Sequence, residues 1–326
     1  MNYRIWRDKG RRWMALLAFA SFSAQVNAAY PERPIRVIVP IAPGSVTDVI
    51  LRKAVQPLAQ RLGQPIVIDN KPGASGIIGA EACAKAPADG YTICAIYHAT
   101  TSFNPIFFDR LPYDPDKDFT PVTRLFFLIE GIAVSSATGV KSFDAMRGYA
   151  TDHPGKVSFG TLGDQSVQEL MIGWLNQRWS TRIVGVPYKG GGPIATAIAA
   201  NEIQMGQMGL GNFIAMREAG KLDILTVNSD ARSPLLPNVP TMKELALEGF
   251  DTKSWWGIAA PRGVPADVVV RLHSAFKDVF ESPEVASFLQ AQYIEGALTT
   301  PGEFKAFLTS DRDKARKLIE LYKTKR

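Results

Sequence analysis

The chain has 326 residues, 21% of them charged, and a formal net charge of +6. The length suits two ordinary domains or one large one, and an apolar share of 46% is typical of a globular protein. The first 28 residues hold five basic groups and one acid, a net of +4, which leaves +2 for the rest. The basicity thus lies mostly in these 28 residues, and a nucleic-acid-binding or polybasic membrane-surface role loses its support.

The first 28 residues have the pattern of a secretory leader. Basic residues between Arg4 and Arg12 precede an apolar run from Trp13 to Phe22, and Val26 to Ala28 offers small residues for cleavage. The apolar run is about half the ~20 residues that a membrane span needs. We therefore predict a signal peptide at residues 1–28 and export to the periplasm.

Strands and helices alternate along the rest of the chain. We expect strands at 36–40, 66–69 and 91–97, with helices at 48–62 and from 77 to 86 between them. A second set comprises helices at 142–151, 167–177 and 194–200 and strands at 157–159, 183–186 and 222–227. Strands separated by helices at this spacing pair in parallel, so the pattern predicts an α/β fold of two similar lobes, each a mainly parallel sheet flanked by helices.

Two apolar segments divide these sets. Residues 126–134 can leave the first lobe, and residues 253–259 can cross back to it. We assign 29–134 and 253–326 to one lobe and 135–252 to the other. Further helices are expected at 241–248, 266–280, 283–290 and 301–322.

Four junctions between a strand and a helix are rich in glycine or small polar residues, at 43–48, 72–79, 160–166 and 188–193. In a parallel sheet such loops emerge at the carboxyl ends of the strands, where ligands bind. In the first loop, Thr47 and Asp48 are candidate caps of the following helix. The unpaired amides of a helix start favour an anion, so we expect this loop to hold a carboxylate.

Signs of catalysis are few. No serine lies in a G-x-S-x-G context, no loop has dinucleotide or Walker spacing, and no histidines and carboxylates have metal spacing, so we predict no enzyme, no cofactor and no metal. His98 can contact ligand or bond to a neighbouring backbone. Asp48 as a general base would make an exported hydrolase, but its place before a helix favours a cap.

Cys83 and Cys94 are the two cysteines of the chain. They lie on an expected helix and on the strand that follows it. In an oxidising compartment they can form a disulfide if their side chains face each other, or remain as two buried thiols.

Short motifs distributed in order over the chain carry a resemblance. They are 30–35 (Tyr-Pro-Glu-Arg-Pro-Ile), 39–40, 43–44, 47–48, 62–65, 70–74, 78–81, 89–92, 111–114, 118–122, 186–190, 238–241 and 255–257. With these motifs, the sequence resembles the extracytoplasmic solute receptors of tripartite tricarboxylate transporters, also called Bug proteins.

The resemblance implies a type II periplasmic binding protein of the Venus flytrap kind. Such a protein captures a small carboxylate, works as a monomer and delivers its ligand to the membrane permease. The expected ligand-binding residues are Pro43, Gly44, Ser45, Val46, Thr47, Asp48, His98, Thr100, Thr161, Gly163, Gln165, Ser166, Tyr188 and Gly190. An alternative from another class is a receptor that senses a carboxylate for a signalling partner without transporting it.

The chain departs from the family pattern in three places. Ser45 stands where many relatives have a glycine, and Asp164 places an acid in the second lobe's loop. Residues 205–212 lack an aspartate that relatives often carry. The identity of the ligand therefore does not follow from the resemblance.

Overall fold

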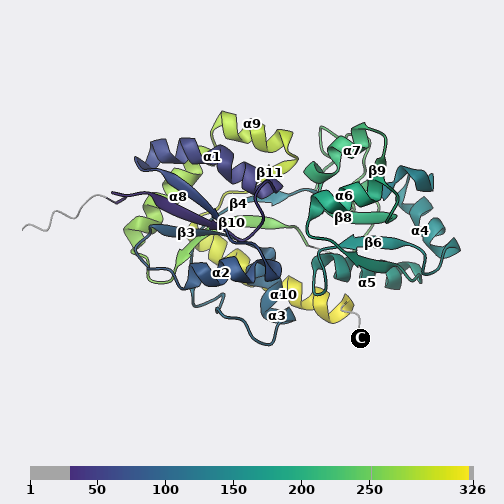
Figure 1. Cartoon of the computed structure of the whole chain (residues 1–326), viewed down its shortest axis with the longest axis horizontal. Coiled ribbons are helices and arrows are strands. Elements are labelled where there is room, and N and C mark those ends of the chain that lie inside the picture. Colours follow the sequence, from purple (N-terminus) through teal and green to yellow (C-terminus); the bar gives the residue numbers. More distant parts are fainter. Residues whose placement is uncertain (1–29, 251, 323–326) are drawn as a thin grey trace, which may run out of the picture.

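The computed structural model describes residues 30–250 and 252–322, and its two lobes lie side by side along the long axis (Figure 1). The predicted signal peptide at 1–28 lies outside the described residues. The α/β fold with one sheet in each lobe is confirmed. Among the described helices, none is long and apolar enough to cross a membrane.

The first lobe is built on a six-stranded sheet with the spatial order β11-β4-β10-β3-β1-β2. Its strands are β1 (Ile35–Val39), β2 (Ile66–Asn70), β3 (Thr92–Tyr97), β4 (Phe119–Leu128), β10 (Trp255–Pro261) and β11 (Ile294–Gly296). β1 pairs in parallel with β2 and β3, whereas β10 is antiparallel to β3 and β4. The loops after β1, β2 and β3 therefore emerge at one edge of this sheet.

Helices cover both faces of the first sheet. One face packs against α1 (Val46–Leu62), α8 (Ala266–Phe280) and α9 (Pro283–Ala291), and the other packs against α2 (Ile77–Ala84) and the first half of α10 (Pro301–Tyr322). The short turns η1 (Ala74–Gly76) and η2 (Ala99–Phe103) and the helix α3 (Asn104–Phe107) lie in the connections. The three-residue strand β11 was not predicted, since so short an apolar segment has no readable period.

The second lobe is built on a five-stranded sheet with the order β7-β6-β8-β5-β9. Its strands are β5 (Glu130–Ser135), β6 (Ser158–Thr161), β7 (Val184–Pro187), β8 (Met205–Gly209) and β9 (Leu222–Val227). Its helices are α4 (Phe143–Asp152), α5 (Val167–Trp179), α6 (Gly191–Ala199) and α7 (Ile214–Glu218), with the turns η3 (Ser136–Thr138) and η4 (Leu210–Asn212). β6 is parallel to both β7 and β8, so their loops share one edge.

Three segments connect the lobes. The chain leaves the first sheet at Leu128 and enters the second at Glu130, so the outgoing crossing is at Ile129. It returns through residues 252–254 into β10. The predicted boundary after residue 134 thus falls at the end of β5 instead of before it.

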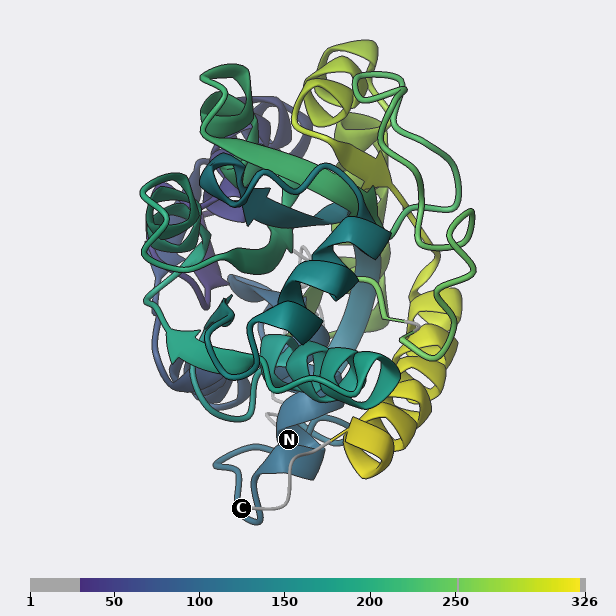
Figure 2. The same cartoon turned by 90° about the vertical axis from the view of Figure 1, so that its right-hand side faces the viewer.

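The third connection is α10. Phe304 and Leu308 belong to a core cluster of the first lobe, whereas Ala315, Leu318 and Ile319 belong to one of the second. Figure 2, which turns the second lobe toward the viewer, shows this yellow helix along one side of the molecule. Although the predicted boundaries place 301–322 in the first lobe, the helix packs on both.

Gly173 of α5 allows the end of α10 to approach closely. A Cβ at this position would lie 2.3 Å from the carbonyl oxygen of Tyr322, a distance that requires the helices to separate. Gly173→Ala is expected to destabilise the protein by about 2 kcal/mol despite the higher helix propensity of alanine. Chemical denaturation measures the change.

Gly148 of α4 provides the matched control, because a Cβ there meets nothing within 4 Å. Gly148→Ala should stabilise the protein by roughly 0.5–1 kcal/mol. Equal effects of the two substitutions would show that α10 does not press on α5.

Cys83 and Cys94 form a disulfide that joins α2 to β3, with 6.0 Å between their Cα atoms. Both residues are buried. The bond closes a loop of 11 residues in sequence separation, and loop closure on this scale contributes about 3 kcal/mol to stability in the chain-entropy model. Of the two alternatives left open by the sequence, the structure has the disulfide.

The predicted helix at 241–248 is wrong. The chain makes successive turns there, and Ala246 has a left-handed φ of 50°. A side chain in this conformation ends a helix, so the segment completes no more than one helical turn.

Candidate ligand-binding site

The loop between β1 and α1 is capped by Ser45. Its φ of −67° and ψ of 157° are extended, and its hydroxyl accepts a hydrogen bond from the amide of Asp48 at 3.3 Å. The prediction that Thr47 or Asp48 caps the helix is therefore wrong, and α1 begins two residues earlier than predicted. We call residues 43–48 the anion loop.

The buried side chain of Asp48 stabilises the anion loop through hydrogen bonds. Its carboxylate accepts hydrogen bonds from the Gly44 amide at 2.9 Å, from Arg52 Nε at 2.8 Å and from Asn70 Nδ2 at 2.9 Å. Burial alone would raise the pKa of Asp48, but the bonds from Arg52, Gly44 and Asn70 together lower it below the ordinary value. Because only 1% of its surface is exposed, the Asp48 side chain is buried and holds the anion loop in shape.

Two backbone amides at the start of α1 have no hydrogen-bond acceptor among the described residues. Gly44 donates to Asp48, and the Asp48 amide donates to Ser45, but those of Val46 and Thr47 have no acceptor within residues 30–250 and 252–322. They lie at the positive end of a 17-residue helix. Pro43 and Gly44 are exposed and Val46 is half-exposed, so an anion can approach this end of the helix, where Thr47 itself is buried.

The segment that follows β8 meets the anion loop from the second lobe. A Cβ on Gly211 of η4 would lie 3.4 Å from Cγ2 of Val46, so the two lobes touch here. A Cβ on Gly191 would lie 2.7 Å from the side chain of Asn212, which places the β7–α6 loop beside the same turn. The sequence contained a signal, the glycine-rich run 206–211, but no strand was assigned at 205–209.

The loop between β6 and α5 is also ordered by its own polar groups. Ser166 caps α5 by accepting from the Glu169 amide, and the buried Thr161 hydroxyl accepts from the Gly163 amide at 3.2 Å. Gln165 donates from Nε2 to the carbonyl of Phe107 at 3.2 Å, which links this loop to α3. Asp164 is exposed.

Tyr188 and Gly190 follow β7. The amide of Tyr188 donates to the Thr161 carbonyl at 2.8 Å, so this loop and the β6–α5 loop lie side by side. The side chain of Tyr188 is half-exposed. Gly190, with a φ of 157°, precedes the first residue of α6.

The fourth glycine-rich loop, at 72–79, is explained by packing. A Cβ on Gly79 would lie 2.7 Å from Pro40, and one on Gly76 would lie 2.8 Å from the Tyr97 ring. Asn104 also bonds to the Ser75 carbonyl at 3.0 Å. Glycine is needed here for close contact between elements of the first lobe.

His98 and Thr100 follow β3. Burial lowers the pKa of His98 to about 4, so its ring is neutral near pH 7, and its buried Nδ1 has no partner among the described residues. The Thr100 hydroxyl donates to the carbonyl of Tyr97 at 2.9 Å and is fully buried. Neither residue places a positive charge near the anion loop.

The cations closest in sequence to the anion loop are already paired. Arg52 bonds to Asp48 and Asn70, Lys53 pairs with Glu284, and Arg36 lies 3.6 Å from Asp69. No group of three or more metal-ligating side chains occurs among the described residues. The anion loop itself therefore offers neutral hydrogen-bond donors to a negative group.

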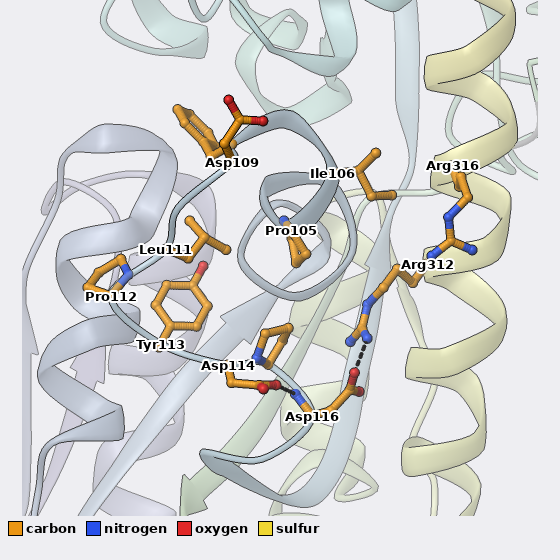
Figure 3. A pocket seen from close by; sticks show the side chains of 12 residues that line it. Pro105, Ile106, Asp109, Leu111, Pro112, Tyr113, Asp114, Asp116, Arg312 and Arg316 are labelled. Atoms are coloured by element: carbon orange, nitrogen blue, oxygen red, sulfur yellow. Dashed lines mark hydrogen bonds and ion pairs between the residues drawn. The ribbon is translucent and has the colours of Figure 1, made fainter.

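A separate concavity of about 660 Å³ lies between residues 105–116 and α10, and none of the predicted ligand-binding residues lines it (Figure 3). Arg312 there pairs with Asp116 and donates to the Thr101 carbonyl, while Arg316 pairs with Asp313. Because both guanidinium groups are engaged, this concavity lacks an unpaired arginine for a carboxylate.

Comparison with known proteins adds to this geometry. Residues 50–323 match the family model described as "Tripartite tricarboxylate transporter family receptor". The chain belongs to the tripartite tricarboxylate transporter receptor family. The match spans both lobes, so the family assignment rests on most of the chain and not on one motif.

Three relatives illustrate what this receptor is similar to. Protein BugT of Bordetella pertussis is 30% identical over 90% of this chain and 91% of its own. A structure titled "R. palustris Rpa4515 with adipate" is 28% identical, with a TM-score of 0.84 over 90% of this chain and 98% of that one. MatC from Rhodopseudomonas palustris "with bound malate" is also 28% identical, with a TM-score of 0.79 over 89% and 100%.

Proposed function

We propose that this receptor captures a small mono- or dicarboxylate in the periplasm and delivers it to the membrane permease of a tripartite tricarboxylate transporter. The observation that carries the proposal is the pair of unpartnered amides, Val46 and Thr47, at the open N-terminus of α1. Two solved relatives hold adipate and malate, and both are carboxylates. The leader-like residues 1–28 support export to the periplasm.

We place the ligand between the anion loop and the loops of the second lobe. The carboxylate accepts from Val46 and Thr47, while Ser166, Tyr188 and Gly190 face it across the gap. In this proposal Asp48, Thr100 and Thr161 hold the loops in shape, because their side chains are buried and already bonded. Closure of the lobes then excludes water from the bound carboxylate.

The ligand leaves unchanged, and the receptor acts as a monomer. Neutral donors hold an anion reversibly, and the site offers no nucleophile activated by a neighbouring base. The neutral ring of His98 has no hydrogen-bond partner among the described residues that would orient it as a base.

Thermal unfolding of the mature protein, from residue 29, against a panel of carboxylates tests the function. A ligand at 100 times its dissociation constant adds about 2.7 kcal/mol of stability. We expect at least one mono- or dicarboxylate to raise the melting temperature by roughly 5 °C and its amide analogue to leave it unchanged. Stabilisation by a neutral sugar or a metal ion, with none by any carboxylate, would refute the proposal.

A further inference from the structure

The two crossing strands between the lobes are tied together by Glu130. Its carboxyl accepts from the Ser254 hydroxyl at 2.7 Å, and its amide donates to Asn228 Oδ1 at 2.8 Å. Gln207 Nε2 of β8 lies 3.3 Å from the second carboxyl oxygen. Glu130 is the first residue of the outgoing strand and Ser254 directly precedes the returning one, so the bond joins the two crossings.

The third connection is tied to the same place by Asp311 of α10. Its Oδ2 accepts from the Trp255 indole at 2.7 Å and from the Ser102 hydroxyl at 2.5 Å. Both Asp311 and Trp255 are buried. Because Ser254 and Trp255 are adjacent, all three connections between the lobes meet at one dipeptide through two buried carboxyl groups.

We propose that Glu130 and Asp311 are positioning residues that form a carboxyl clamp on Ser254 and Trp255, and that loss of the Glu130 proton opens the lobes and weakens ligand binding. The inference rests on the proposed function for its second half only. Neither residue contacts the ligand. Both act through the crossing segments that must rotate when the lobes move.

Burial favours the neutral form of Glu130 in the observed conformation, whereas the side chains of Ser254, Gln207 and Asn228 all donate to its carboxyl and favour the charged form. Burial raises the pKa of Glu130 from 4.5 to about 7, and the bond from Ser254 offsets part of this rise. The segments packed against Glu130 carry few charges, and those are paired with each other or far along the strand. They are Asp230 and Lys253, which pair at 2.8 Å, Glu295, which lies 3.8 Å from Lys253, and Asp223, which pairs with Lys141 at the other end of β9.

Asp311 has its own charged neighbours. Burial raises its pKa, while the bonds from Ser102 and Trp255 and the charges of Lys314 and Arg124 lower it in part. The next residue, Arg312, pairs with Asp116. These cations leave Glu130 as the member of the clamp without a nearby counter-charge.

The direction in which pH changes lobe closure depends on how far water reaches the Glu130 carboxyl. The lobes touch at Val46 and Gly211 in the observed conformation, and Glu130 is 5% exposed. In this proposal, opening rotates the crossings and lets water reach the carboxyl, which brings the pKa of Glu130 closer to the ordinary 4.5. Glu130 then takes up a proton when the lobes close. The contribution of this proton to the stability of the closed form is lost as the pH rises through about 7.

Small-angle X-ray scattering of the ligand-free mature protein tests the clamp directly. For the wild type we expect a larger radius of gyration at about pH 8.5 than at about pH 5.5, on either side of the raised pKa of Glu130. Glu130→Gln keeps the shape of the side chain and removes its charge at every pH. The radius of gyration of this variant should therefore not change with pH. Asp313→Asn, at an exposed ion pair on α10, should behave like the wild type.

Calorimetric titration with the strongest stabilising carboxylate tests the coupling. Each unit of pKa difference between the open and closed forms changes affinity tenfold, so we expect roughly tenfold weaker binding by the wild type at about pH 8.5 than at about pH 5.5. Glu130→Gln should abolish the dependence. Ser254→Ala, which removes the hydroxyl that favours the carboxylate, should move the midpoint to higher pH.

The outcomes separate the two proposals. If no carboxylate binds, the proposed function fails while the scattering result still decides the clamp. If the radius of the wild type is independent of pH, or if Glu130→Gln and the wild type change alike, the clamp is refuted. If Glu130→Gln does not fold, the Ser254→Ala variant decides instead. A pH midpoint of binding equal to that of the wild type in Ser254→Ala then refutes the clamp.

Discussion

Replacing Asp48 by alanine is expected to lower the free energy of unfolding by about 3 kcal/mol and to weaken carboxylate binding more than tenfold. The substitution removes the acceptor of the Gly44 amide and one of the two acceptors of the half-buried Asn70 amide, which also donates to the Ile41 carbonyl. Arg52 is half-exposed, so the loss of its ion pair adds little. Without these bonds the anion loop no longer holds the start of α1 open in one shape.

Chemical denaturation and calorimetric titration of Asp48→Ala measure the two effects. Asp278→Ala is the matched control, since Asp278 forms an exposed ion pair with Arg61 near the other end of α1. It should change stability by less than about 1 kcal/mol and leave binding intact. Similar losses for both variants would contradict the role assigned to Asp48.

The destabilisation in Asp48→Ala should depend on pH in a known direction. The hydrogen bonds lower the pKa of Asp48 below 3.8, so its contribution is fully present above that value. As the pH falls through the lowered pKa, the carboxylate takes up a proton and the contribution is lost. The difference between wild type and variant is therefore expected to be largest near neutral pH and to shrink in acid.

Val46→Pro is expected to weaken carboxylate binding by about ten- to a hundredfold while leaving the fold intact. A hydrogen bond to a charged group is worth about 1.5–3 kcal/mol, and proline has no amide to donate. Val46 is the first residue of α1, a position that accepts proline, and Ser45 already has the extended conformation that precedes proline. The substitution thus removes one donor at little structural cost.

Val46→Ala is the control for this experiment, because it keeps the amide and removes the side chain that contacts Gly211. We expect its affinity to remain within about threefold of the wild type and the stability of both variants to stay within about 1 kcal/mol. If Val46→Ala weakens binding as much as Val46→Pro, then contact between the lobes, and not the amide, controls affinity.

The sequence predicted the alternation of strands and helices because amphipathic periods and glycine or proline stops are local signals. It also located the loop between β1 and α1, since an apolar strand followed by Pro-Gly-Ser indicates a turn before the next helix. The cap was misplaced because Ser45, Thr47 and Asp48 are all residues that cap helices. Only the backbone angles of Ser45 decide among them.

The wrongly predicted helix at 241–248 begins with a genuine capping pair. Thr241 and Glu244 do form the reciprocal capping pair that marks a helix start, with Thr241 N to Glu244 Oε2 at 2.8 Å and Glu244 N to Thr241 Oγ1 at 3.1 Å. The chain nevertheless turns away at Ala246. A true start signal does not show how far the helix continues.

The contacts between the lobes were out of reach of sequence reasoning. The meeting of Val46 with Gly211 and the clamp at Ser254 and Trp255 join residues more than 50 positions apart. They depend on how two separate sheets are placed relative to each other. At 72–79, a glycine pattern that suggests ligand binding also serves close packing within the first lobe.

The most direct test is a crystal structure of the mature protein with its strongest stabilising carboxylate. We expect a carboxylate oxygen within about 3 Å of the Val46 and Thr47 amide nitrogens, with Asp48 still bonded to Gly44 and Arg52. A carboxylate bound instead to a lysine or arginine side chain, or seated in the concavity beside Arg312, would contradict this mode of recognition.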